Sequence, residues 1–148
     1  IFYSWAMKAA AERYAAKPDA KYVEFIAQQT RTFLDGFQTQ SAATENSCAH
    51  VEGLAAARRV LISVTQPDRD LVRRLNQRID REMTKNLALQ ILPGQTRIEL
   101  ASGAYLSSPT VADYAGAFLA GTHQPYVRID YTQHCLSAMI ELTQRQAR

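Results

Sequence analysis

Long hydrophobic runs are missing from this sequence of 148 residues. A membrane-spanning helix needs about 20 consecutive apolar residues, and the two longest apolar stretches, 54–64 and 112–120, are interrupted by Arg58, Arg59 and Asp113. No signal peptide is visible, because a basic region, an apolar core and a cleavage site are all missing at the N-terminus. The sequence therefore predicts no membrane span, and it leaves the compartment open between a bacterial-type cytoplasm and a periplasm.

Familiar catalytic motifs are also missing. The chain contains no GxSxG, no phosphate-binding loop, no GxGxxG and no HExxH, so nucleotide hydrolysis, dinucleotide chemistry and the common serine and zinc hydrolases have no support. His50 and Glu52 have the HxE spacing of zinc deaminases, but the PCxxC that those enzymes require is absent. We expect no cofactor, and no metal at His50, His123 or His134.

Excess charge of one sign is small. The net charge is +3, and the arginines that gather between residues 67 and 92 alternate with Asp68, Asp70, Asp80 and Glu82. Mixed charge of this kind is typical of a solvated helix face with salt bridges. Nucleic-acid binding is therefore not expected.

Cysteine is scarce. Cys48 and Cys135 are the two present, and they form no CxxC, which argues against a zinc or redox motif. Each lies in an apolar helical context, where small buried thiols are common. A disulfide between two helices is the alternative, and it would indicate an oxidising compartment.

Helical periodicity dominates what is present. Apolar residues recur every three or four positions through most of the chain, and Pro, Gly and capping residues separate the segments. The pattern predicts an all-α fold of about six helices in consecutive antiparallel hairpins, with a short extended segment near 95–108. The expected helices are residues 1–16, 20–37, about 44–64, 67–92, 109–121 and 129–146.

Particular residues set these expectations. Asp19 follows Pro18 and is placed to cap the second helix. In the fourth helix, apolar residues recur every four positions from Leu71 to Ile91, so a winding buried stripe is expected. Thr110 and Asp113 have capping-box spacing. The last helix is expected to be buried through Leu136, Met139 and Ile140. We expect residues 1–148 to form one helical-hairpin domain, and part of a longer protein because the chain starts at Ile1 without Met.

Four segments carry a resemblance to a known class of folds. They are residues 4–10 (SWAMKAA), 22–26 (YVEFI), 45–54 (ENSCAHVEGL) and 127–134 (VRIDYTQH). Successive hairpins with aromatic and Ala-rich faces resemble the α/α toroids, which include sugar epimerases, glycoside hydrolases and polysaccharide lyases. A two-helix unit takes roughly 34 to 47 residues in helical repeats, so this chain is at most half of a six-hairpin toroid. The resemblance implies a carbohydrate-active protein.

The densest polar cluster at an expected helix start is Arg128, Asp130 and His134. Asp130 and His134 are four residues apart, so on a helix they share a face and can form a hydrogen bond. A carboxylate that orients a histidine is one way to hold a general base in a single tautomer. The alternative is that Asp130 stabilises the positive helix N-terminus while His134 packs at the edge of the core.

His50 and Glu52 belong to a second cluster, whose candidate site residues are Glu45 and Asn46. At the first turn of the third helix they would project into a cleft at one end of the hairpins, where Glu45 would act in acid–base chemistry and Asn46 would bind substrate. The alternative is a helix cap.

Aromatic residues at expected helix ends and in loops complete the candidate site. We expect Trp5, Tyr126 and Tyr131 to stack against a sugar ring, together with Arg128 as a polar binding group. Tyr and Trp are equally at home as half-buried core residues with a satisfied polar tip.

Two functions follow as hypotheses. The first is a fragment of a carbohydrate-active toroid protein that hydrolyses, cleaves or epimerises a saccharide through Asp130, His134 or Glu45. The second is a non-catalytic helical scaffold that binds a protein partner or self-associates, since half a toroid would leave apolar helix faces open.

Overall fold

The structure, a computed structural model, describes residues 2–36 and 45–143. The elements, in chain order, are α1 (Phe2–Ala16), α2 (Ala20–Gly36), α3 (Cys48–Leu61), α4 (Arg69–Leu87), β1 (Arg97–Glu99), β2 (Tyr105–Ser107), the 3₁₀ helix η1 (Pro109–Tyr114) and α5 (Ile129–Thr143). The two short strands pair antiparallel, with Ile98 opposite Leu106. The expected all-α architecture with a short extended segment near 95–108 is thus confirmed.

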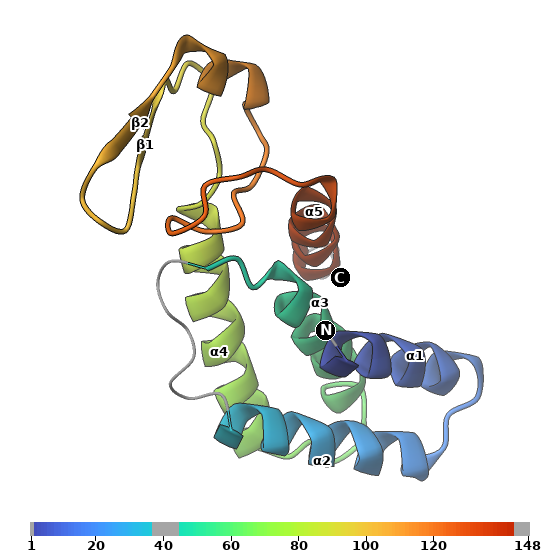
Figure 1. The fold of residues 1–148 in the computed structure, drawn as a ribbon. Coiled ribbons are helices and arrows are strands. Elements are labelled where there is room, and N and C mark those ends of the chain that lie inside the picture. The colour runs from blue at the N-terminus through green and yellow to red at the C-terminus, as the bar shows by residue number, and fades with distance from the viewer. Residues whose placement is uncertain (1, 37–44, 144–148) are drawn as a thin grey trace.

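Two helical hairpins, α1–α2 and α3–α4, form the larger part of the molecule (Figure 1). The breaks that precede α2 and α4 have the same chemistry. Asp19 accepts a hydrogen bond from the backbone N–H of Lys21 at 3.0 Å, and Asp68 accepts one from that of Leu71 at 3.0 Å. Each carboxylate therefore satisfies an otherwise unpaired N–H of a first helical turn, as the sequence predicts.

Helix α3 lies at the centre and contacts α1, α2, α4 and α5 (Figure 1). Small residues allow the closest of these crossings. A Cβ added at Gly53 would lie 2.8 Å from the Cα of Ser4 and 3.0 Å from the ring of Tyr3, so the backbones of α3 and α1 touch here. Ala56 and Ala57, one turn further along α3, are also fully buried.

Helix α4 ends at Leu87, about one turn earlier than predicted. Residues four apart advance about 40° round the helix at each step, so Leu87 lies about 160° from Leu71. Leu71, Leu75 and Ile79 are accordingly buried, whereas Leu87 is 46% exposed. The chain then leaves the helix, and the expectation that the buried stripe continues to Ile91 within α4 is wrong.

A second, smaller core takes up the apolar residues after α4. Leu89 and Ile91 pack with Ile98, Val111 and Leu119 beneath the β1–β2 hairpin. The turn between α4 and β1 contains Gly94 at φ +76°, a conformation that Gly adopts without strain.

The segment expected as a short fifth helix forms η1 instead. Its N-cap is Ser108, whose hydroxyl accepts from the backbone N–H of Thr110 at 3.2 Å. The Thr110–Asp113 capping box is therefore corrected: the chain begins its turn two residues earlier, and the helix stops at Tyr114.

Helix α5 packs against α3 through a face that shares only Met139 with the predicted one, since Met139 is half-buried against Cys48, Phe118 and Cys135. Cys135 and Ala138 are buried, whereas Leu136 is 48% and Ile140 is 54% exposed. The bond between Cys135 and Cys48 fixes this rotation, because it holds the Cys135 face against α3. Among the described helices, none is long and apolar enough to cross a membrane.

Candidate functional site

A cleft of about 340 Å³ lies at the end of the helical bundle where α3 and α5 begin. Its lining comes from two stretches that are far apart in the sequence, 45–46 and 120–131: Glu45, Asn46, Ala120, Gly121, His123, Gln124, Tyr126 and Tyr131. Four of the predicted site residues, Glu45, Asn46, Tyr126 and Tyr131, therefore meet in one concavity.

The extended segment 117–121 brings these residues together. The backbone N–H of Asn46 donates to the carbonyl of Ala120 at 2.8 Å, and the N–H of Ala120 donates to the carbonyl of Tyr126 at 2.9 Å. Glu45 forms an isolated antiparallel bridge with Gly121. The segment thus lies between the approach to α3 and the approach to α5, and it fixes the width of the cleft.

The side chain of Asn46, besides lining the cleft, holds two backbone segments together. Its amide oxygen accepts from the backbone N–H of Cys48 at 3.0 Å, and its amide nitrogen donates to the carbonyl of Leu119 at 3.1 Å. Helix α3 begins at Cys48 with Ser47 as its N-cap, so Glu45 and Asn46 precede the first turn in which they were expected; the Asn46 side chain nevertheless satisfies the N–H of the first helical residue. Of the two residues in this cluster, Glu45 is the one whose side chain is exposed in the cleft.

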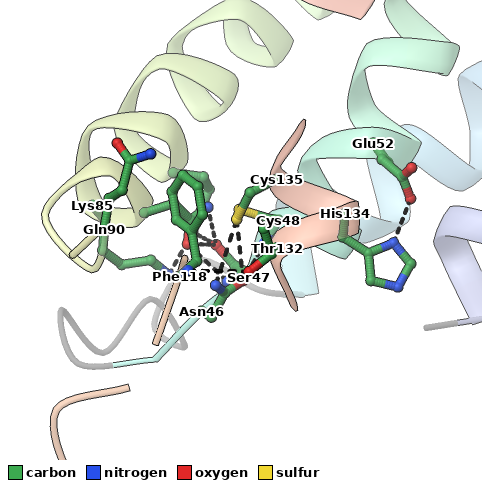
Figure 2. Close-up of a disulfide and its surroundings, with 12 residues drawn as sticks. Asn46, Ser47, Cys48, Glu52, Lys85, Gln90, Phe118, Thr132, His134 and Cys135 are labelled. Atoms are coloured by element: carbon green, nitrogen blue, oxygen red, sulfur yellow. Dashed lines mark hydrogen bonds and ion pairs between the residues drawn. A yellow bond between two sulfur atoms is a disulfide. The ribbon is translucent and has the colours of Figure 1, made fainter. Parts of the chain in front are cut away.

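Directly behind the cleft, Cys48 and Cys135 form a disulfide (Figure 2). Of the two possibilities for these cysteines, buried free thiols or a disulfide between two helices, the structure has the disulfide. Both cysteines are fully buried, and Phe118 packs against them. The disulfide links the first residue of α3 to α5, two residues from Asn46 and four from Tyr131. It therefore holds two walls of the cleft together.

An aromatic pair forms one rim. The rings of Tyr126 and Tyr131 lie 6.2 Å apart and are inclined at 54°. The guanidinium of Arg128 lies 5.4 Å from the centre of the Tyr131 ring and donates to both carboxylate oxygens of Asp130, at 2.9 and 2.7 Å. The pKa of Tyr131 is raised, first by its hydrogen bond to Tyr126 and then by burial.

His134 has a different partner from the predicted one. Its Nδ1 lies 2.8 Å from Oε2 of Glu52, while Asp130 is engaged by Arg128. The expected Asp130–His134 hydrogen bond is therefore corrected, since Arg128 reaches Asp130 from two residues away. Figure 2 shows the His134–Glu52 pair to one side of the group formed by the disulfide, Asn46 and Ser47.

From the sequence, Glu52 was considered only for its HxE spacing with His50, and the partners that it has in the structure were not predicted. It is 1% exposed, and Lys8 donates to its Oε1 at 3.1 Å. Burial acts to raise the pKa of Glu52, but the hydrogen bonds from Ser137, Lys8 and His134 outweigh burial, so the pKa lies below its usual value. A carboxylate at this position thus joins α1, α3 and α5. The sequence signal was a single Glu within an apolar, Ala-rich segment.

A second buried polar cluster ties α3 to α4. The carboxylate of Glu82, which is 2% exposed, accepts from Arg78 at 2.7 Å and from Lys85 at 2.7 Å. The hydroxyl of Ser47 donates to the same carboxylate, and the side chain of Asn86 accepts from the Ser47 backbone N–H at 2.9 Å. This cluster fixes the start of α3, and hence the position of the cleft wall.

The remaining predicted residues lie outside the cleft lining. Trp5 is 62% exposed on α1, and Arg128 borders the cleft through the Tyr131 ring. His50 packs edge-on against Phe33 with ring centres 5.3 Å apart, and burial lowers the pKa of His50. Within residues 2–36 and 45–143, no three His, Cys, Asp or Glu side chains gather as a metal site would require.

No protein-family model, curated protein or solved structure matches this chain.

Proposed function

We propose that the cleft binds a saccharide, and that the chain is part of a carbohydrate-active protein of the α/α toroid kind. One observation carries this proposal: Glu45, Gln124 and the Tyr126–Tyr131 pair line a single concavity of about 340 Å³. That volume lies within the range of roughly 300–1,000 Å³ that is usual for small-molecule sites.

The lining has the two components that a sugar ring needs. A pyranose presents apolar C–H groups on its face and hydroxyl groups at its edge. The tilted rings of Tyr126 and Tyr131 offer flat, amphipathic surfaces to the apolar C–H face of the sugar. Glu45, His123 and Gln124 offer hydrogen-bond acceptors and donors to the hydroxyl groups at the sugar's edge, and all three side chains are exposed.

Chemistry on the bound sugar is the finer part of the proposal. Glu45 is the carboxylate of the cleft lining and would move a proton to or from a sugar hydroxyl or the glycosidic oxygen. Asp130 and His134, which the sequence also put forward, are not among the residues that line the cleft: Arg128 holds Asp130 and Glu52 holds His134, so the proposal assigns them no contact with the bound sugar. Hydrolysis, lysis and epimerisation all use acid–base groups of this type.

Saccharide binding is tested by titrating the protein with neutral oligosaccharides while following backbone amide NMR signals. We expect shifts at residues 45–46 and 120–131, and a Kd about fivefold weaker for Tyr131→Ala, because one stacked ring contributes about 1 kcal/mol. Tyr105→Ala is the matched control, since Tyr105 also carries an arginine, Arg97, at 4.0 Å from its ring centre. An equal loss of sugar affinity in both variants contradicts the proposal. So does the absence of any change in the NMR signals of the cleft residues with every sugar tested.

Catalysis needs a separate test. On a saccharide that the protein turns over, Glu45→Gln is expected to lower kcat by about 10²-fold or more, as for loss of a general acid or base. His134→Ala is expected to keep its activity, because His134 bonds to Glu52 and does not line the cleft; a loss of activity as large as that of Glu45→Gln would contradict this assignment.

A non-catalytic scaffold is the second candidate, and the exposed face of α5 favours it. Ile129, Leu136 and Ile140 lie on one side of the helix and are 88%, 48% and 54% exposed. Contiguous exposed apolar side chains are typical of protein interfaces. Light scattering across a concentration series tests self-association: a dimer that Leu136→Glu dissociates supports the scaffold, and a monomer at all concentrations argues against a homo-oligomer.

A further inference from the structure

We infer that the cleft selects an uncharged saccharide and rejects uronates and phosphorylated sugars. The inference rests on the proposed function, because it names the class of saccharide that the same cleft takes. Its basis is the balance of charge on the side chains and helix ends that surround the cleft.

The lining holds one formal charge, and it is negative. Among the described residues that form the cleft, Glu45 is the only carboxylate and there is no Lys or Arg. Residues 37–44, which precede Glu45 in the sequence, contain no charged residue either. A uronate or a phosphate in the cleft would therefore face a like charge and no cation.

The cation beside the cleft is already neutralised. Arg128 donates two hydrogen bonds to Asp130 while its guanidinium lies over the Tyr131 ring. This bidentate arrangement is the one that an incoming carboxylate would need. An anionic ligand would have to displace Asp130 and leave that carboxylate without its partner.

The partial positive charges at the N-termini of α3 and α5 also have partners within the protein. Asp130 lies in the first turn of α5, where its charge offsets the roughly half-unit positive charge of a helix N-terminus. At α3, the amide oxygens of Asn46 and Asn86 accept from the backbone N–H groups of Cys48 and Ser47. Each helix end is therefore already engaged in part by a carboxylate or by amide oxygens, which weakens the attraction for an anion that an uncapped helix N-terminus would have.

A neutral sugar meets none of these penalties. Its hydroxyls can donate to Glu45 and exchange hydrogen bonds with Gln124 and His123, and its apolar face can rest on Tyr126 or Tyr131. The binding free energy would then come from stacking and hydrogen bonds, so it would depend little on salt.

The experiment compares two series of probes of equal length. Tetrasaccharides of glucose, mannose and N-acetylglucosamine form the neutral series, and tetrasaccharides of galacturonate and mannuronate form the anionic series. We expect the best neutral probe to bind at least about tenfold more tightly than either uronate, with the same Kd at low and at physiological ionic strength. A uronate that binds as tightly overturns the inference and leaves saccharide binding intact. If no probe of either series binds, the proposed function and the inference both fall.

Reversing the charge of the cleft gives an independent readout. Glu45→Lys is expected to bring the affinity for the uronate series above that for the neutral series, because the new ammonium supplies the missing cation. Glu24→Lys, the same charge change on the exposed face of α2, is the control and should alter neither series. Equal effects of the two variants, or unchanged preference in Glu45→Lys, would show that Glu45 does not set the selectivity.

Discussion

The bond between Cys48 and Cys135 offers the most demanding quantitative test of this structure. It closes a loop across a sequence separation of 87 residues. The chain-entropy treatment gives about 4.5 kcal/mol of stabilisation for a loop of this length. Domains of this size usually have roughly 5–15 kcal/mol of stability in total, so loss of the bond is expected to remove a large share of it.

The perturbation is the double variant Cys48→Ala/Cys135→Ala. Alanine leaves no buried thiol unpaired, and the lost packing against Phe118 adds a smaller cost of its own. The free energy of unfolding is measured by urea titration with circular dichroism. We expect it to fall by about 4.5 kcal/mol, and we expect the slope m to rise, because an uncrosslinked unfolded chain exposes more surface.

A matched comparison separates the crosslink from the packing. Wild-type protein that is unfolded, reduced and refolded in reductant keeps both sulfur atoms, so its loss of stability reflects the crosslink alone. If the reduced protein and the oxidised protein differ by less than about 1 kcal/mol, or if m stays the same, the Cys48–Cys135 bond does not constrain the unfolded chain as described. Amide signals of residues 45–46 and 131 should also broaden in the reduced form, because the two cleft walls are then no longer tied.

Two further perturbations probe the contacts that hold α1 against the rest. Glu52→Gln is expected to cost about 2 kcal/mol at pH 7, since Lys8 and His134 both bond to this carboxylate. The pKa of Glu52 is lowered in the folded protein, so its stabilisation is present above its usual pKa of 4.5 and is lost as the pH falls through the lower, folded value. The difference between wild type and variant, measured by urea titration, should therefore narrow below pH 4.5; a constant difference would contradict the ion-pair assignment. Gly53→Ala is expected to cost about 2 kcal/mol, because the new methyl would lie 2.8 Å from the Cα of Ser4, and thermal unfolding compared with Gly36→Ala, where nothing lies within 4 Å, measures the effect.

Only part of the candidate site could be read from the sequence. Glu45 and Asn46 were selected as polar residues at an expected helix start, and Tyr126 and Tyr131 as aromatic residues at expected helix ends or in loops; all four line the cleft. The partner of His134 could not be selected in this way. A spacing of four shows which residues share a helix face, but Glu52 reaches His134 across 82 positions of sequence.

The sequence by itself determined the helical character of the chain and the breaks that precede α2 and α4. Pro18, Asp19, Pro67 and Asp68 act on their immediate neighbours, through a missing N–H, a fixed φ or a capping carboxylate. Such effects need no tertiary context, so the predicted starts of α2 and α4 agree closely with the structure.

The tertiary structure decided which faces are buried and which polar groups meet. Leu136 and Ile140 have the spacing of a core face, yet the disulfide turns Cys135 and Ala138 inward in their place. Apolar periodicity identifies a stripe but not the neighbour that covers it. The choice among competing stripes, and with it the cleft, depends on contacts between segments such as Asn46 and Ala120 that are distant in the chain.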